Sequence, residues 1–286
     1  MARIAYVNGR YGPISAARVS VEDRGFQFAD GVYEVLKLIR GRLVDADRHL
    51  ARLRRSLGEL RIEPPCSDAA LQRVVKETIT RNGLGNALIY IQVSRGTAPR
   101  NHPFPAAAKP TLVVTLRRLN LPGATELEKG TKIITLLDER WGRCDIKSTG
   151  LLPNVLAKQA AQEAGCREAW LYDAAASDDP VITEGSSTNA WIVDENGVLR
   201  THPTGSAILG GVTRSVVLEL AVAAGVKVEQ RAFTLGELRR AREAFLTSAT
   251  SLVLPVTTID GHPVANGMPG ETTRRLMADY AAHCGI

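Results

Sequence analysis

Residues 143–154, RCDIKSTGLLPN, connect an apolar stretch that ends near Trp141 to an apparent helix that begins near Leu151. The segment contains one lysine, Lys147, in a chain that has 8 lysines and 28 arginines. Most lysines are solvated surface residues, but loops between regular elements often carry functional side chains on a rigid scaffold. Lys147 is therefore a candidate reactive amine, provided that other stretches supply the groups such an amine needs.

One requirement is a site that binds an anion. The stretch LGGVTR, residues 209–214, has the glycine-rich pattern typical of such a site. Two glycines and Thr213 stand at the entrance of an expected helix, where free backbone N–H groups and the helix dipole attract negative charge. Taken alone, the same residues also form an ordinary glycine turn with an N-cap threonine.

A carboxylate is the second such group, and ITEGSSTNAW, residues 182–191, places Glu184 between two apolar strands. The run has two interpretations. It forms a polar hairpin loop, or its small residues allow the Glu184 carboxylate to point inward. A reactive lysine, an anion site and an inward carboxylate are what pyridoxal phosphate (PLP) requires. They supply its covalent link, its phosphate site and the partner of its ring nitrogen.

Three stretches in this order and spacing resemble the class IV (fold-type IV) PLP-dependent aminotransferases: DIKSTGLLPNVLAKQAA, TEGSSTNAW and GGVTR. The N-terminal half adds VEDRGFQFADGVYEVLK, RHLARL and SRGTAPRNHPFP, so that the resemblance covers nearly the whole chain. It implies a two-domain α+β fold, with a smaller N-terminal α+β domain and a larger C-terminal pseudo-barrel domain that binds PLP.

The resemblance also implies roles for individual residues in binding the cofactor. Lys147 is the Schiff-base lysine and Glu184 faces the pyridine nitrogen. The phosphate is held by Arg52 and by the backbone of Val212 and Thr213. A threonine of the family pattern falls on Ala249 here, so that Ser248 or Thr250 is expected to substitute for it.

The substrate class follows from a second part of the resemblance, because Arg100 and His102, with Tyr33, are similar to the carboxylate trap of D-amino-acid aminotransferases. Arginine binds a carboxylate through two parallel hydrogen bonds, and a histidine and a tyrosyl hydroxyl add donors. In the family the Arg-x-His pair comes from the partner subunit, which implies a homodimer with shared active sites. The expected reaction is transamination between a D-amino acid and a 2-oxo acid.

Three alternatives with the same fold stay open: an (R)-amine transaminase, a branched-chain L-amino-acid transaminase and an aminodeoxychorismate lyase. An alternative from another class is a basic nucleic-acid-binding protein, since the net charge is +6. The densest basic run, at Arg48–Leu57, places its arginines around an expected helix whose leucines form an apolar stripe. A solvated helix face explains these arginines, and no nucleic-acid-binding motif accompanies them. We therefore expect small amino acids and 2-oxo acids as partners, and no nucleic acid.

The domain division is expected to follow the Pro122-Gly123 break, with domains at 1–118 and 127–286 and a linker at 119–126. Hairpin turns are expected at Asn8-Gly9, Arg40-Gly41 and Asn196-Gly197. The main expected helices cover about 47–60, 67–81, 151–165, 213–225 and 270–283, and β-branched runs between them predict strands.

Metal, membrane and secretion signals are weak. The five histidines form no HExxH or HxH pair, and the four cysteines form no CxxC pair, so no metal site is expected. No apolar run approaches the length that spans a membrane, and the N-terminus lacks the apolar region of a signal peptide. These features predict a cytoplasmic protein with no membrane partner.

Overall fold

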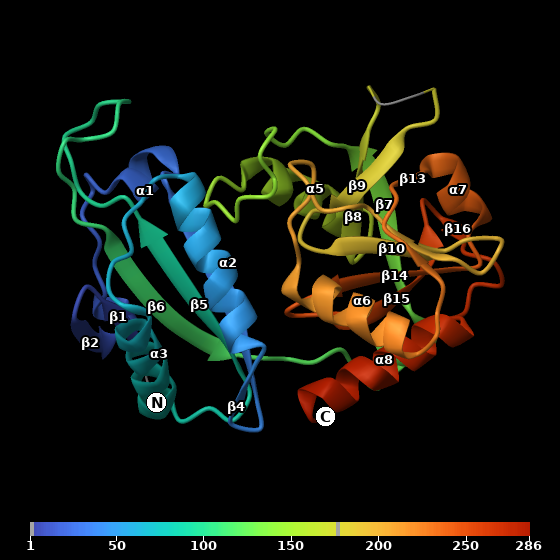
Figure 1. Ribbon diagram of the computed structural model, residues 1–286, viewed down its shortest axis with the longest axis horizontal. Coiled ribbons are helices and arrows are strands. Elements are labelled where there is room, and N and C mark those ends of the chain that lie inside the picture. Colours follow the sequence, from blue (N-terminus) through green and yellow to red (C-terminus); the bar gives the residue numbers. More distant parts are fainter. Residues whose placement is uncertain (1–2, 176–177) are drawn as a thin grey trace. The chain divides into compact units, whose positions relative to one another are not determined.

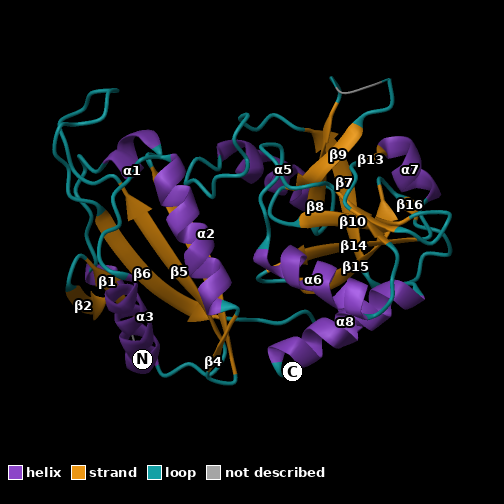
Figure 2. Cartoon of the chain, in the orientation of Figure 1, coloured by secondary structure: helices purple, strands orange, loops and turns teal. Residues whose placement is uncertain are grey.

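The computed structural model describes residues 3–175 and 178–286, and the chain divides into two compact units. The first unit extends to Asn120 and also includes Ile146–Leu151. The second unit comprises Leu121–Asp145 and Leu152–Ile286. Both units combine helices with strands (Figure 2), as the expected α+β class requires. A helix beginning at Ala124 occupies part of the expected 119–126 linker.

Among its described residues, the first unit contains a six-stranded sheet and three α-helices. Its elements are β1 (Ile4–Val7), β2 (Arg10–Pro13), the 3₁₀ helix η1 (Ile14–Ala16), α1 (Arg24–Phe28), β3 (Gly31–Ile39), β4 (Arg42–Val44), α2 (Ala46–Glu59), α3 (Asp68–Asn82), β5 (Ala87–Ser94) and β6 (Thr111–Arg118).

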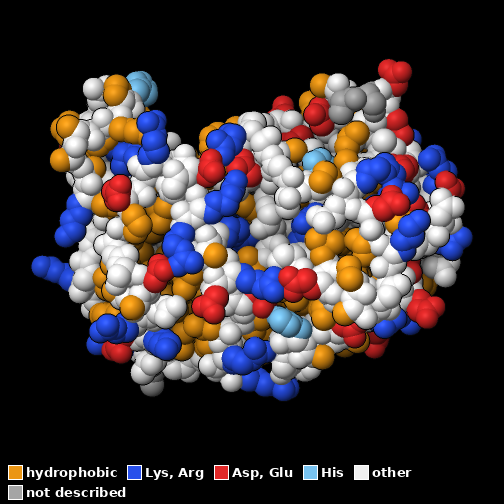
Figure 3. All heavy atoms as spheres, in the orientation of Figure 1, with side chains coloured by type: hydrophobic (Ala, Val, Ile, Leu, Met, Phe, Trp, Pro, Cys, Tyr) orange, Lys and Arg blue, Asp and Glu red, His pale blue; other side chains and the backbone are white. Residues whose placement is uncertain are grey.

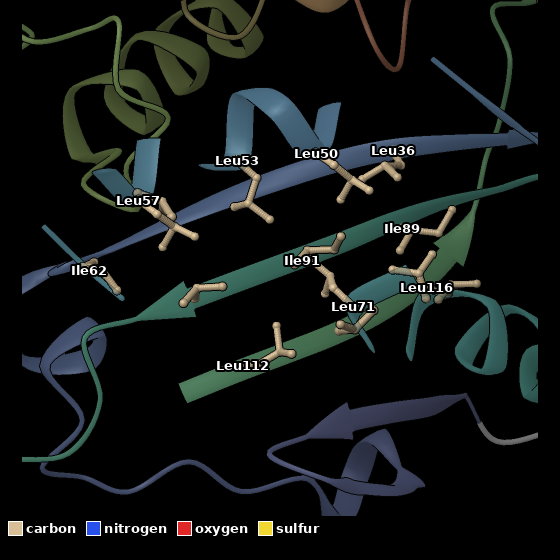
Figure 4. Packing of buried hydrophobic residues seen from close by; sticks show 14 of the residues in the cluster. Leu36, Leu50, Leu53, Leu57, Ile62, Leu71, Ile89, Ile91, Leu112 and Leu116 are labelled. Atoms are coloured by element: carbon tan, nitrogen blue, oxygen red, sulfur yellow. The ribbon is translucent and has the colours of Figure 1, made fainter. Parts of the chain in front are cut away.

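The strands of this sheet lie in the order β2-β1-β6-β5-β3-β4, and every neighbouring pair is antiparallel. Helices α2 and α3 cover one face (Figure 1), and their leucines pack with alternate residues of the strands. Figure 4 shows this core, which includes Leu53 and Leu57 of α2 and Ile89 and Ile91 of β5. Because successive strand residues point to opposite faces, the other face carries the half-buried Tyr33, Tyr90 and Gln92.

The local chemistry of the first unit explains where its elements turn. Asn8 and Gly9 have φ angles of 45° and 95°, as the predicted tight hairpin requires. The predicted start of α3 is confirmed, because the Ser67 side chain accepts a hydrogen bond from Ala70 N. Its end is set by Gly83, whose φ of 62° suits a residue without a Cβ.

The segment around Lys147 belongs with the first unit, although its sequence position lies far beyond the first 120 residues. Ser148 forms an isolated antiparallel bridge with Val32, and Thr149 N donates to Gly31 O at 3.0 Å. Hydrogen bonds of this kind satisfy the backbone of an irregular segment by extending the β3 edge. Local sequence pattern does not reveal such a long-range pairing.

The second unit contains a ten-stranded sheet with helices around it. Its elements are α4 (Ala124–Lys129), β7 (Thr131–Leu137), α5 (Leu152–Glu163), β8 (Glu168–Asp173), β9 (Val181–Gly185), β10 (Asn189–Val193), β11 (Leu199–Thr201), α6 (Val212–Ala223), β12 (Val228–Glu229), β13 (Phe233–Thr234), α7 (Leu235–Arg240), β14 (Glu243–Ser248), β15 (Leu252–Ile259), β16 (His262–Pro263) and α8 (Glu271–Cys284).

The second sheet follows the order β12-β11-β10-β14-β15-β7-β8-β9-β13, with β16 paired to β15. Strands β15, β7 and β8 are parallel neighbours, while β10, β14 and β15 run antiparallel in turn. The sheet is the counterpart of the pseudo-barrel expected for the C-terminal part. Its core includes Trp170, Phe233 and Leu254, all buried. The sheet places Glu184 at the end of β9 and Asn189 at the start of β10.

Three general features concern metal ions, membranes and surface charge. Among the described residues, no cluster of His, Cys, Asp and Glu could hold a metal ion. None of the helices in that part of the chain has both the length and the apolar character needed to cross a membrane. On the face drawn in Figure 3, basic and acidic side chains are interspersed, so the net charge does not form one basic patch there.

Candidate active site

Lys147 is half-buried, and hydrogen bonds hold both its backbone N–H and its backbone carbonyl. Its N–H donates to Ser56 Oγ at 3.3 Å, and its carbonyl accepts a hydrogen bond from Tyr33 N at 2.9 Å. The Nζ atom lies 4.2 Å from the centroid of the Tyr33 ring, within the range of a cation–π contact. The side chain is therefore held against an aromatic surface.

Tyr33 is itself supported by a second tyrosine. The rings of Tyr33 and Tyr90 stack with centroids 5.4 Å apart, and the Tyr90 hydroxyl donates to Gln92 Oε1 at 2.8 Å. Burial, together with the neighbouring Tyr33, raises the pKa of Tyr90 to about 12. The pair therefore offers an aromatic support for the lysine.

Arg52 takes part in a buried ionic cluster. Its Nε and Nη2 atoms donate to the two oxygens of Glu34 at 2.9 and 2.7 Å, and His49 Nδ1 lies 2.9 Å from Glu34 Oε1. Glu34 is fully buried. Although burial opposes its charge, Arg52 and His49 hold the pKa of Glu34 well below its ordinary value. This bidentate contact fixes the plane of the Arg52 guanidinium.

Glu184 is buried, and Arg140, Leu209 and Asn189 are among its hydrogen-bond donors. Its Oε1 accepts from Arg140 Nη1 at 2.5 Å and from Leu209 N at 3.0 Å, and its Oε2 accepts from Asn189 Nδ2 at 2.9 Å. A carboxylate that accepts several donors is held in its ionised form. The inward carboxylate expected from the sequence therefore has a charged partner and a defined orientation.

Arg140 is oriented by Asp138 on its other edge. Arg140 donates through Nε and Nη2 to the two Asp138 oxygens, at 2.9 and 2.7 Å, and Thr183 Oγ1 donates to Asp138 at 2.7 Å. Burial alone would lower the pKa of Arg140, but Asp138 and Glu184 raise it. The pKa of Asp138 is lowered by Arg140 against the opposite effect of burial. The charges thus alternate from Asp138 through Arg140 to Glu184.

The N-terminus of α6 has the features of an anion site. Its N-cap is Gly211, which provides no side-chain cap for the first N–H groups of Val212 and Thr213. A Cβ on Gly211 would lie 2.0 Å from Asn189 Oδ1, so that a larger residue would displace the amide that contacts Glu184. The Thr213 hydroxyl lies 3.3 Å from the Tyr280 hydroxyl.

Ser248 is the last residue of β14, and Thr250 lies in the turn to β15. Their hydroxyl oxygens are 3.1 Å apart, and Ser248 Oγ also accepts from Ser251 N at 2.9 Å. Leu252 follows with a φ of 57°, a backbone conformation rare for a residue with a side chain. That one of these two hydroxyls binds the phosphate stays a prediction.

Arg100 and His102 are exposed in the loop between β5 and β6. The Arg100 guanidinium lies 4.6 Å from the centroid of the Phe28 ring, and the His102 ring lies 5.4 Å from it. Both side chains therefore gather at Phe28, whereas Tyr33 contacts Tyr90 and Lys147. That the Arg-x-His pair serves another copy of the chain stays a prediction.

The site residues predicted from the sequence are divided between the two units. The first unit holds Tyr33, Arg52, Arg100, His102 and Lys147, and the second holds Glu184, Val212, Thr213, Ser248 and Thr250. A buried, oriented carboxylate and a helix N-terminus without a side-chain cap suit the ring nitrogen and the phosphate of PLP. The donor set of the chain therefore fits this cofactor.

Sequence reasoning missed three supporting residues: Glu34, Arg140 and Asn189. Glu34 left a signal, since it is a charged residue within the apolar strand GVYEVLKLI. Asn189 left one as well, because it opens the strand that follows Glu184 after a short turn. Arg140 left none, because 44 residues separate it from Glu184 and no motif links them.

The chain is similar to known proteins in sequence and in structure. The family model described as Amino-transferase class IV matches residues 31–259. A D-alanine aminotransferase of Bacillus licheniformis is 42% identical over 269 residues, which cover 94% of this chain and 93% of that protein. A D-alanine aminotransferase of Staphylococcus epidermidis is 37% identical over 276 residues, 96% of this chain and 95% of that protein.

Solved structures of similar fold include two branched-chain amino acid aminotransferases. The T.th. enzyme with pyridoxamine 5′-phosphate has a TM-score of 0.90 and 26% identity, and the match covers 100% of this chain and 95% of that one. The Escherichia coli enzyme has a TM-score of 0.90 and 23% identity, covering 99% and 94%. At 23% identity, the second likeness concerns the fold alone.

Proposed function

Because this chain belongs to the class IV aminotransferases, as its sequence motifs led us to expect, we propose that it is a PLP-dependent D-amino-acid aminotransferase. The reaction moves the amino group of a D-amino acid to a 2-oxo acid, for example from D-alanine to 2-oxoglutarate, giving pyruvate and D-glutamate. The substrate class rests on the similarity to D-alanine aminotransferases, which are 42% and 37% identical to this chain over nearly its full length.

The cofactor supplies the electron sink of this chemistry. When PLP is bound, its protonated ring withdraws electrons from the substrate Cα, so that the Cα proton becomes removable. We propose that Lys147 would hold the cofactor through its amine and would carry the Cα proton of the substrate. Glu184 keeps the ring nitrogen protonated. The single observation that carries this role is the buried contact between Glu184 and Arg140 at 2.5 Å.

Three sets of donors are proposed to bind the phosphate of the cofactor. Arg52 supplies a charged donor, and the N–H groups of Val212 and Thr213 supply the helix terminus. Ser248 or Thr250 supplies a hydroxyl. The contact between Arg52 and Glu34 supports this role, because it limits the orientations available to the guanidinium.

The substrate carboxylate is proposed to bind to Arg100 and His102 of a second copy of the chain, together with Tyr33. This assigns a homodimer with shared active sites to the protein. A carboxylate fixed on one side decides which Cα substituent faces Lys147, and therefore which enantiomer reacts. The expected location in the cell remains the cytoplasm.

The test is a panel of D-amino acids, L-amino acids and (R)-amines in the first half-reaction, followed by the absorbance of the bound cofactor. D-alanine and D-glutamate should react faster than their L-enantiomers. Faster reaction with L-leucine would favour the branched-chain alternative, and faster reaction with an (R)-amine would favour the amine alternative. Release of pyruvate from aminodeoxychorismate, without a second oxo acid, would identify the lyase.

The Arg100→Leu variant tests the carboxylate trap directly. Loss of a charge-assisted contact of about 1.5–3 kcal/mol should raise KM for D-alanine about 10- to 150-fold. An (R)-amine without a carboxylate should be affected much less. Equal losses for both substrates would mean that Arg100 supports the fold and does not bind substrate.

A further inference from the structure

The loop that carries Arg100 and His102 is fixed through its backbone by a buried arginine of α1. Arg24 is 4% exposed, and its guanidinium donates to the carbonyl of Asn101 at 2.5 Å and to that of His102 at 3.1 Å. These two carbonyls belong to the residue between the two proposed carboxylate ligands and to one of the ligands itself. Arg24 therefore holds the backbone of the loop beside Arg100 and His102, whose side chains are proposed to bind the substrate carboxylate.

Asp30 holds Arg24 in turn and connects it to a second anchor. Arg24 Nε donates to Asp30 Oδ2 at 2.7 Å, and Arg95 donates to both Asp30 oxygens at 2.8 and 3.0 Å. Although burial opposes its charge, the two arginines lower the pKa of Asp30. The Arg95 guanidinium lies 3.6 Å from the centroid of the Phe104 ring, farther along the same loop. One carboxylate thus fixes both ends of the segment 101–104.

Phe28, the last residue of α1, supports the side chains. Its ring lies 4.6 Å from the Arg100 guanidinium, 4.9 Å from the Arg24 guanidinium and 5.4 Å from the His102 ring. An exposed arginine loses considerable side-chain entropy when it binds a ligand, and an aromatic support reduces that loss beforehand. The ring therefore limits Arg100 and His102 to a small region.

We propose that Arg24 and Phe28, held by Asp30, are positioning residues that set Arg100 and His102 for the α-carboxylate of the substrate. This proposal rests on the proposed function, and it adds a consequence. Because Arg100 and His102 serve the partner's active site, Arg24 and Phe28 act on the active site of the partner subunit and not on the site that contains their own Lys147.

The first variant is Phe28→Leu, which keeps an apolar side chain and removes the aromatic faces. A cation–π contact contributes about 0.5–2 kcal/mol, so KM for D-alanine should rise about 2- to 30-fold. The turnover number and the KM for (R)-1-phenylethylamine should change less than about twofold, within the range of ordinary surface substitutions. The second variant, Arg24→Lys, keeps the charge toward Asp30 but lacks the planar fork that holds two carbonyls, and it should raise the same KM.

A matched control removes another cation–π contact of the same unit. The guanidinium of Arg81, in α3, lies 4.5 Å from the centroid of the ring of Tyr11, in β2. Tyr11→Leu should leave KM for D-alanine unchanged. Trypsin provides a readout that does not depend on activity, since it cleaves after Arg100. Phe28→Leu should speed this cleavage and Tyr11→Leu should not.

The decisive experiment uses hybrid dimers with one Phe28→Leu subunit and one Lys147→Ala subunit, purified through two different tags. Only one active site of the hybrid contains Lys147, and its Arg100 and His102 come from the Lys147→Ala subunit, where Phe28 is intact. The hybrid should therefore show the parental KM for D-alanine at about half the parental turnover, as expected when one of two independent sites is lost.

The outcomes separate the two levels of the proposal. A raised KM in the hybrid would overturn the action across the subunits, and an unchanged KM in the Phe28→Leu homodimer would overturn the positioning role itself. If the parent enzyme does not transaminate D-alanine at all, the proposed function fails. In that case, tryptic cleavage at Arg100 that is equal in parent and Phe28→Leu contradicts the support of the loop as well.

Discussion

The Nζ atom of Lys147 lies 4.2 Å from the centroid of the Tyr33 ring, and the Tyr33 N–H donates to the Lys147 carbonyl at 2.9 Å. The two residues are 114 positions apart in the sequence, yet they share a side-chain contact and a backbone hydrogen bond. Tyr33 therefore has two separable tasks in the proposed site: its ring supports the lysine, and its hydroxyl is expected to bind the substrate carboxylate.

Substitutions at Tyr33 should separate these tasks. Tyr33→Phe keeps the ring and loses one hydrogen-bond donor, so KM for D-alanine should rise about fivefold, as for a contact of about 1 kcal/mol, with little change in turnover. Tyr33→Ala also removes the support of Lys147, so turnover should fall as well. Steady-state kinetics of both variants provide the check. Identical kinetics would show that the ring does not position the lysine.

Glu184→Gln should retain the cofactor and lose most of the activity. The amide cannot keep the ring nitrogen protonated, and the proposed phosphate contacts are made elsewhere. Turnover should therefore fall by orders of magnitude, while the dissociation constant of PLP changes modestly. Fluorescence titration with PLP and the initial rate with D-alanine measure the two quantities. Turnover equal to that of the parent would remove Glu184 from this role.

Arg52→Ala should weaken PLP binding about 10- to 150-fold, because a charge-assisted contact contributes about 1.5–3 kcal/mol. Arg55 lies on the exposed side of the same helix, and Arg55→Ala is the matched control. Removing Arg52 also leaves the buried Glu34 without its arginine, which lowers stability. The double variant Arg52→Ala/Glu34→Gln removes both charges and should show the same loss of PLP affinity. If long dialysis removes PLP equally from parent and variant, Arg52 does not bind the phosphate.

The sequence predicts more of the fold than of the site's supporting contacts. Turn residues such as Asn8-Gly9 and the Ser67 cap act locally, so the main helices and strands of both units were correctly predicted. Short elements were missed, although α7 carries a capping box between Thr234 and Glu237 that its spacing reveals. The contact between Arg140 and Glu184 depends on the pairing of distant strands, which no local pattern encodes.

Stability should fall as the pH decreases below about 6.5, because of His49. Burial lowers the pKa of His49 below its ordinary value of 6.5, and the hydrogen bond to Glu34 opposes this only in part. The unfolded chain therefore takes up the proton first, so this contribution is present above about pH 6.5 and is lost as the pH falls toward the folded-state pKa. The slope is at most about 1.4 kcal/mol per pH unit.

Urea unfolding between about pH 7 and pH 5, followed by circular dichroism, measures this slope. His49→Gln keeps a donor for Glu34 but does not titrate, so its stability should depend less on pH in this window. Asp30 and Asp138 have lowered pKa values and ordinary values of 3.8, so their contributions are lost only at lower pH. Equal slopes in parent and variant would contradict the assignment to His49.

The central claim is that Lys147 carries the cofactor, and borohydride reduction of the PLP-loaded enzyme tests it most directly. Reduction makes the bond between the cofactor and its lysine permanent, and mass spectrometry of a proteolytic digest then locates the modified residue. We predict a phosphopyridoxyl group on Lys147, in the peptide that contains DIKSTG. The Lys147→Ala variant should fold, carry no label and lose transamination by orders of magnitude. A label on another of the eight lysines would contradict the account.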